Sequence, residues 1–147
     1  MNRVCRVVSL LVFGALVSSA AGQKKKDDFR QPTQQWVGVL KDVKLKAAAK
    51  DVDVITDAAT FEKLWKAWQP KAELPKVDFA THFVVVVVSD YEPFKLSLYG
   101  GPDAWKRSNS NKSPQQIKGG FGWGIGVFER KGVAELSGKK IDAPKEK

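Results

Sequence analysis

The spacing of apolar residues predicts one amphipathic helix near the middle of the chain. Its apolar side chains recur at i, i+3, i+4 and i+7: Phe61, Leu64, Trp65 and Trp68. This spacing places all four on one helix face, where the two tryptophans are expected to pack against a core. Thr56 or Asp57 can cap the N-terminus and Pro70 stops the helix, so we expect it to cover about residues 57–69.

Apolar runs without helical spacing predict β-strands on both sides of this helix. The run Phe-Val-Val-Val-Val-Val at 83–88 is typical of a central strand that is covered on both faces. Other segments have one apolar face and predict half-buried strands: 35–46, 52–55, 95–99 and 133–136. A hairpin turn at 129–132 is expected to lead into the last of them.

The segment 121–128 alternates large apolar residues with glycine. As a strand it would carry all of its large side chains on one face. Gly122, Gly124 and Gly126 would leave the other face bare. Another element of the fold, or a ligand, could then approach the backbone closely on that face.

Together these elements predict a single α+β domain over residues 34–141. We expect one mainly antiparallel sheet of five or six strands packed on the helix. Residues 23–33 are polar and predict a flexible linker, and 142–147 predict a disordered tail. The segment 100–120 holds two prolines and a polar run, so we expect an irregular loop there.

The first 22 residues have the three parts of a cleavable signal peptide. Arg3 and Arg6 precede an apolar run at 7–17, and small residues at 18–22 provide a cleavage site. Cleavage is expected after residue 20, 21 or 22, with 22 favoured. The apolar run is shorter than the roughly 20 residues that a membrane-spanning helix needs, so no span is expected after cleavage. We therefore expect the mature protein in the periplasm or extracellular space; the alternative is an uncleaved N-terminal anchor.

Cysteine and histidine content excludes several kinds of site. Cys5 is the only cysteine and lies in the predicted signal peptide, so the mature chain has no thiolate nucleophile, disulfide or zinc–thiolate site. With His82 as the one histidine, transition-metal ligands are lacking, and we expect no metal and no cofactor. Asp51 and Asp53 have no further oxygen donors nearby in sequence and make a weak calcium signal.

No motif singles out a catalytic residue. His82 can be grouped with Ser89 and either Asp78 or Asp90, but no nucleophile motif surrounds the serine. A histidine at the start of a buried strand is expected to be structural. The sequence has no phosphate-loop or dinucleotide fingerprint. A hydrolase that uses two carboxylates stays open, because any two of the 16 acidic residues could meet in space.

The stretch 54–88 resembles part of a known family. It combines a short strand, a capped helix, a Val-Asp-Phe turn and the valine-rich strand. The residues concerned are Ile55, Asp57, Phe61, Leu64, Trp65, Trp68, Pro75, Val77–Phe79 and Phe83–Val88. In these features it resembles the C-terminal domain family of PrcB, a lipoprotein that stabilises a secreted protease complex. The resemblance covers about a quarter of the chain. The family's Gly-Gly-Tyr strand corresponds to 119–121, which here follows the valine strand by some thirty residues. The resemblance implies an α+β domain that binds or stabilises rather than catalyses, and it carries over no functional residue.

We therefore expect a secreted, non-catalytic protein that binds or stabilises a protein partner. The candidate interaction surface joins an aromatic and basic cluster to the bare glycine face: Trp105, Lys106, Arg107, Gly122, Gly124 and Gly126. The alternative for Trp105 is that it folds back to cover the core. Without Arg3 and Arg6, 23 basic residues stand against 16 acidic ones, a net charge of +7. Binding of an anionic envelope polymer or polysaccharide is thus a second hypothesis, whereas export makes nucleic acid an unexpected ligand.

Overall fold

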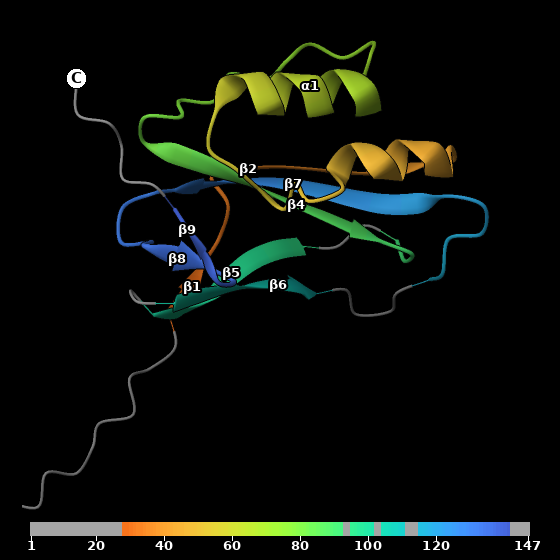
Figure 1. The fold of residues 1–147 in the computed structure, drawn as a ribbon. Coiled ribbons are helices and arrows are strands. Elements are labelled where there is room, and N and C mark those ends of the chain that lie inside the picture. The colour runs from red at the N-terminus through yellow and green to blue at the C-terminus, as the bar shows by residue number, and fades with distance from the viewer. Residues whose placement is uncertain (1–27, 93–94, 102–103, 111–114, 142–147) are drawn as a thin grey trace, which may run out of the picture.

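The computed structural model describes residues 28–92, 95–101, 104–110 and 115–141. Figure 1 shows three layers, with helices over a first sheet and a second sheet on the far side of the first. Helices packed on mainly antiparallel sheets confirm the predicted α+β class. The predicted signal peptide at 1–22 and the predicted tail at 142–147 lie outside the described residues.

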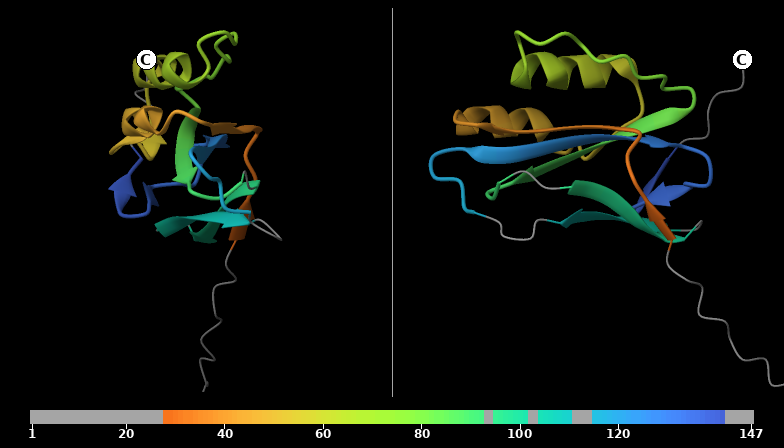
Figure 2. Two further views of the ribbon diagram at one scale, coloured as in Figure 1. Left: turned by 90° about the vertical axis from the view of Figure 1, so that its right-hand side faces the viewer. Right: turned by 180° about the vertical axis from the view of Figure 1, so that it is seen from behind.

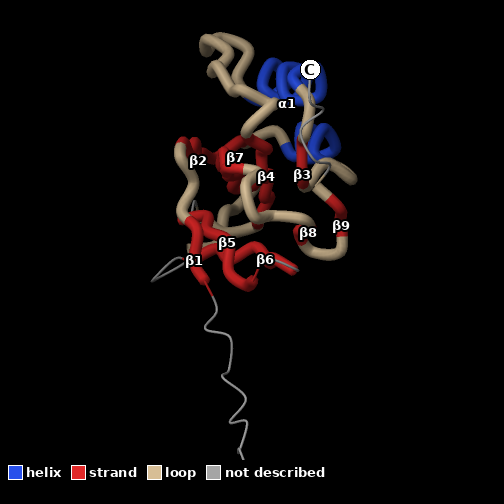
Figure 3. The backbone as a smooth tube through the Cα atoms, turned by 90° about the vertical axis from the view of Figure 1, so that its left-hand side faces the viewer, coloured by secondary structure: helices blue, strands red, loops and turns tan. Residues whose placement is uncertain are grey.

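The two sheets differ in position and are named here accordingly. The inner sheet is entirely antiparallel and has, in spatial order, β2 (Gln34–Leu40), β7 (Phe121–Glu129), β4 (His82–Ser89) and β3 (Val54–Ile55). The outer sheet has, in spatial order, β1 (Asp28–Arg30), β5 (Lys95–Gly101), β6 (Ala104–Ser110), β8 (Glu135–Leu136) and β9 (Lys139–Lys140). Helix α1 (Ala58–Trp68) and the 3-10 helix η1 (Val43–Ala49) lie on the face of the inner sheet that points away from the outer sheet (Figures 1 and 3).

The central strands of the inner sheet, β7 and β4, are covered on both faces, because the helices lie over one face and the outer sheet over the other. Along β4, Val84 and Val86 belong to the apolar cluster under α1. Phe83 and Val85 belong to a second cluster between the two sheets. This two-sided burial is the reason why the sequence of β4 is continuously apolar instead of alternating.

Helix α1 forms where its apolar stripe predicts it. The Asp57 carboxylate accepts a hydrogen bond from the Thr60 N–H at 2.8 Å and caps the N-terminus. Trp68 is fully buried, and its indole N–H donates to the Leu45 carbonyl at 2.9 Å. This bond joins α1 to η1, and Figure 2 shows both helical segments on the same side of the inner sheet.

The predicted strand over 35–46 is wrong in its second half, because β2 ends at Leu40. Residues 43–49 form η1 instead. The Asp42 carboxylate accepts a hydrogen bond from the Lys44 N–H at 3.0 Å, and this cap starts the helical turn. Val43 is 57% exposed, so its alternation with Leu45 does not mark a buried strand face.

The loop predicted over 100–120 is wrong where β6 lies. This strand pairs antiparallel with β5 from Lys95↔Ser110 to Gly101↔Ala104. Its outward residues include Lys106 and Ser108, and a strand with one polar face in water resembles a loop in sequence. The linker predicted over 23–33 is also wrong in part, because Asp28–Arg30 pair with β5 as strand β1.

The hairpin predicted over 129–136 is wrong as well. The chain leaves β7 and crosses to the outer sheet, where β8 pairs in parallel with β6 and antiparallel with β9. Nine strands in two sheets are therefore present among the described residues, instead of five or six strands in one sheet. The second sheet is needed because the inner sheet has two apolar faces and the helices cover only one.

Candidate functional site

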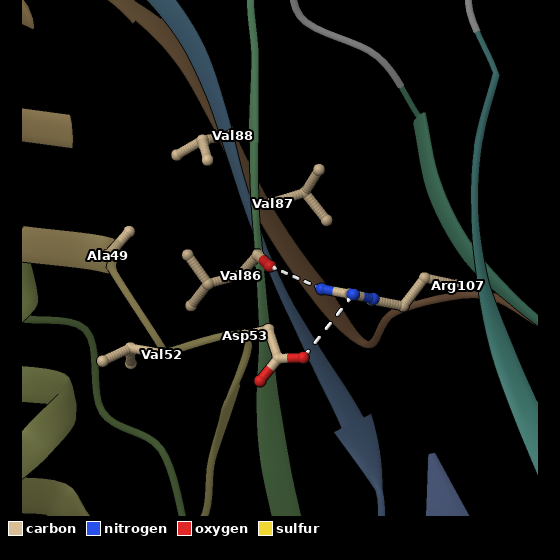
Figure 4. Close-up of a pocket in the computed structure, with 7 residues that line it drawn as sticks. All are labelled: Ala49, Val52, Asp53, Val86, Val87, Val88 and Arg107. Carbon is tan, nitrogen blue, oxygen red and sulfur yellow. Dashed lines mark hydrogen bonds and ion pairs between the residues drawn. The ribbon is translucent and has the colours of Figure 1, made fainter. Parts of the chain in front are cut away.

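A cleft of about 430 Å³ opens beside β4, next to the point where its pairing with the short strand β3 ends. Its lining is mostly aliphatic and comprises Ala49, Val52, Asp53, Val86, Val87, Val88 and Arg107. η1 supplies one wall and β6 supplies the other, as Figure 4 shows. A concave site in which apolar side chains meet a few converging polar groups is the usual form of a ligand-binding site.

The floor of this cleft is an unpaired strand edge. β3 pairs with β4 only at Val54↔Val85 and Ile55↔Val84, and the Val86 N–H then donates to the Asp53 carbonyl at 3.0 Å. Successive residues of a strand direct their N–H and C=O groups to opposite sides, so Val88 directs its groups to the same side as Val86. No described strand pairs with β4 on that side beyond Asp53. The Val88 peptide groups therefore face the cleft.

Arg107 places a cation over this edge. It stands opposite Leu98 in the outer sheet and points toward the inner sheet, across the gap between the two (Figure 4). One guanidinium nitrogen lies 3.4 Å from the Val86 carbonyl and another lies 3.5 Å from an Asp53 carboxylate oxygen. Both contacts are long, and a guanidinium has five N–H donors, so Arg107 keeps capacity for a further acceptor.

The Asp53 carboxylate lies closer to the Lys139 ammonium than to the Arg107 guanidinium. The Lys139 ammonium forms an ion pair and hydrogen bond with one carboxylate oxygen, and Arg107 approaches the other. Burial raises the pKa of Asp53, but the hydrogen bond and charge of Lys139, together with the charge of Arg107, outweigh it, and the pKa is lowered. Asp53 is therefore ionised at neutral pH. Two cations around one carboxylate leave the site with one net positive charge.

The residues that the sequence groups as an interaction surface do not share one surface. Trp105 is buried, its indole N–H donates to the Gly132 carbonyl at 3.0 Å, and the Arg30 guanidinium lies 4.7 Å from the ring centroid. The prediction that Trp105 contacts a partner is wrong, and the alternative, in which it covers the core, is confirmed. Lys106 is exposed on the outer face of β6, and Arg107 lies on its inner face. Of the three, only Arg107 reaches the cleft.

The glycine face of β7 is occupied by the protein itself. Gly122, Gly124 and Gly126 are all buried. A Cβ atom on Gly122 would lie 2.3 Å from the Tyr91 carbonyl oxygen, and one on Gly126 would lie 2.8 Å from a Leu96 methyl carbon. Close approach to the bare backbone is confirmed, but the element that approaches is this chain, so the prediction of a ligand surface there is wrong.

Sequence reasoning missed the cleft because its features are not local. The valines of β4 predict a strand covered on all sides, and nothing in residues 52–55 indicates that the partner strand has only two residues. Asp53 and Arg107 are separated by 54 positions and come together only through the stacking of two sheets.

The grouping of His82 with Ser89 is not assembled. These residues are the two ends of β4, and seven strand steps separate them by about 23 Å. A ring nitrogen of His82 lies 2.8 Å from the Thr81 hydroxyl, which donates to Asp78 at 2.8 Å. Asp90 pairs with Lys46 at 2.9 Å. His82 thus starts a buried strand, as predicted, and Asp78 also accepts the Ala80 N–H at 3.0 Å in the predicted turn.

The described residues bear on two other features, metal clusters and membrane-spanning helices. No cluster of three or more histidine, cysteine, aspartate or glutamate side chains suited to a metal ion occurs among them. Within the same residues, no helix combines the length and apolar character required to cross a bilayer. Comparison of the chain with known protein families, with characterised proteins and with solved structures gives no match.

Proposed function

We propose that this protein is a non-catalytic binding protein that works outside the cytoplasm and holds an extended segment of a protein partner along β4. The observation that carries the proposal is the Val88 peptide group, which faces the cleft and has no strand beside it among the described residues. The predicted export segment and the resemblance to a family of stabilising proteins support the same role. Of the residues that line the cleft, one is acidic, so a pair of catalytic carboxylates has no place in it.

Strand addition is the binding mode that fits this cleft. A partner segment laid beside Val86–Ser89 would continue the line of β3 and pair with the N–H and C=O groups of Val88, which face the cleft. Four residues of edge span about 13 Å, which limits the bound segment to roughly four residues. The valines would provide affinity without strong sequence preference, because they offer apolar area and no directed bonds.

Arg107 indicates that the segment carries a carboxylate. Its long contacts with Val86 and Asp53 leave donors free, and a carboxylate is the anion that matches a guanidinium in two parallel hydrogen bonds. The net positive charge of the site favours the same ligand. An acidic side chain or the C-terminus of the partner would supply this group.

A bead-bound library of random hexapeptides, made with free and with amidated C-termini, tests both the strand addition along β4 and the recognition of a carboxylate by Arg107. We expect the wild-type protein to select peptides that carry a carboxylate. Arg107→Gln removes the cation, and Val88→Pro removes the free N–H without touching the bonds between β4 and β7. Each should weaken binding by about tenfold or more.

Lys106→Gln is the matched control, because it removes one positive charge from the other face of the same strand. Thermal melting of each variant separates lost binding from lost fold. Peptides that bind Val88→Pro as tightly as wild type would place the site elsewhere. If the selected peptides are neutral and bind Arg107→Gln as tightly as wild type, the partner segment does not need a carboxylate. Strand addition along β4 would still stand.

A second candidate function, binding of an anionic envelope polymer, is favoured by a different surface. On the outer face of the outer sheet, Phe29 is 67% exposed and stacks on Tyr99 with ring centroids 6.2 Å apart. Lys106 stands opposite Tyr99. An aromatic pair beside a lysine suits an acidic sugar, whose ring lies on the aromatic face while its carboxylate meets the ammonium.

Polygalacturonate is a suitable probe for this second function. We expect retardation in a polygalacturonate gel that weakens steeply with salt and is reduced by Tyr99→Ala, which leaves the net charge unchanged. Retardation that Tyr99→Ala does not alter would reflect diffuse charge alone and would contradict a site at Phe29 and Tyr99.

A further inference from the structure

The outer edge of β2 at Val37 and Val39 is a second strand edge that no described strand pairs with. β2 ends the inner sheet and pairs on one side only, with β7, from Gln34↔Val127 to Leu40↔Phe121. Gly122, Gly124 and Gly126 direct their main-chain groups to β4, so Trp123 and Ile125 direct theirs to Gly38 and Trp36 of β2.

Val37 and Val39 consequently direct their N–H and C=O groups away from the sheet. These two residues are 44% and 46% exposed, whereas the valines of β4 and β7 are buried or half-buried. No described strand pairs with β2 on this side. An exposed edge with apolar side chains is a template for a further strand.

The charge of the chain identifies the strand that fits. β2 has the sequence Gln-Gln-Trp-Val-Gly-Val-Leu, with no charged residue, in a chain with 25 basic and 16 acidic residues. An acidic partner would be drawn to the basic surface and gains nothing from an uncharged strand. Two copies of this chain repel one another wherever their basic surfaces meet, so an uncharged strand is where they can approach.

We propose that β2 is the interface of a symmetric homodimer. In antiparallel self-pairing, Val37 of one copy stands opposite Val39 of the other, and two four-stranded inner sheets join into one continuous sheet. The main-chain groups of both valines are then paired and their side chains are in contact across the two-fold axis. The cleft beside β4 stays free, because β7 and β4 separate it from β2.

Sedimentation equilibrium of the purified protein tests this proposal. We expect a species of twice the mass of one chain, and its dissociation constant should fall as salt is added, since screening reduces the repulsion between two positive copies. The double substitution Val37→Lys/Val39→Lys places like charges opposite one another at the two-fold axis. It should raise the dissociation constant by about tenfold or more.

Val43→Lys is the control, because Val43 is 57% exposed on η1, away from the edge, and its substitution adds a like charge elsewhere. Amide hydrogen exchange of the wild-type protein gives a second readout that needs no variant. Exchange at Val37 and Val39 should slow as the concentration rises, while exchange at Gly38, whose N–H is bonded to β7, should not change. A monomer at every concentration, or a dimer that the double substitution leaves intact, would overturn the proposal.

Discussion

Gly122→Ala is expected to lower the free energy of unfolding by about 3 kcal/mol, although it adds a single methyl group. A Cβ atom at this position would lie 2.3 Å from the Tyr91 carbonyl oxygen and 3.2 Å from the Ile117 Cδ1. The carbonyl cannot move aside cheaply. Tyr91 bridges to Gln116, and the neighbouring Glu92 N–H donates to the Gln115 carbonyl at 2.9 Å. Urea unfolding of the variant and the wild type measures the loss.

Gly101→Ala is the matched control, because an added Cβ there meets no atom within 4 Å. It should change stability by no more than about 0.5 kcal/mol, with a small gain from reduced freedom of the unfolded chain. Equal stability of Gly122→Ala and Gly101→Ala would mean that Tyr91 does not cover the glycine face of β7. That face would then return as a surface for a ligand.

Arg130→Met is expected to lower the free energy of unfolding by about 2 kcal/mol. Arg130 is 8% exposed, and its side chain donates to the His82 carbonyl and to the Thr56 carbonyl, each at 2.9 Å. Its own N–H donates to the Thr81 carbonyl at 2.9 Å. One side chain thus ties the end of β7 to the start of β4 and the end of β3. Methionine keeps much of the apolar stem but leaves both carbonyls without these donors.

The exposed neighbour Lys131 provides the comparison for this second effect. Lys131→Met removes the same charge one residue further on and should cost less than about 0.5 kcal/mol. Urea unfolding at neutral pH measures both variants. Equal stability of the two would show that the Arg130 charge in the protein costs as much in desolvation as its hydrogen bonds return.

The two free edges of the inner sheet suit different partners for a geometric reason. The edge of β4 is short and lies in a cleft between η1 and β6, so a whole strand with its neighbours has no room to enter. At the edge of β2, the half-exposed Val37 and Val39 direct their main-chain groups away from the sheet. The effect of salt distinguishes peptide binding at β4 from self-association at β2. Added salt should weaken the binding of a carboxylate to Arg107, and it should strengthen the association of two positively charged copies.

Local patterns alone were enough to predict several elements. The spacing of Phe61, Leu64, Trp65 and Trp68, with the Asp57 cap, predicted α1 to within one residue at each end. A helix is encoded this directly because its hydrogen bonds, cap and apolar face all lie within a few residues. The valine run of β4 and the alternation of β5 and β7 were as informative, since each records how many faces of the strand are buried.

Other features were decided by tertiary structure because the contacts responsible are distant in sequence. Strand β6 has a polar outer face and is fixed by pairing with β5 and by the burial of Trp105. The sequence pattern places Arg130 in a turn, where an exposed side chain is expected. It is buried because the end of β7, the start of β4 and the end of β3 meet around it.

The candidate site shows the same division. Sequence predicted that the glycines of β7 admit a close neighbour, but not that Tyr91 is that neighbour. It included Arg107 in an interaction surface but placed it beside Trp105 and Lys106 in a loop. Strand alternation turns Arg107 inward, toward Asp53 and Val86, and turns Lys106 to the opposite face. The sequence determined which residues have one buried face. The stacking of two sheets, which brings residues 54 positions apart into contact, decided which of them open onto a cleft.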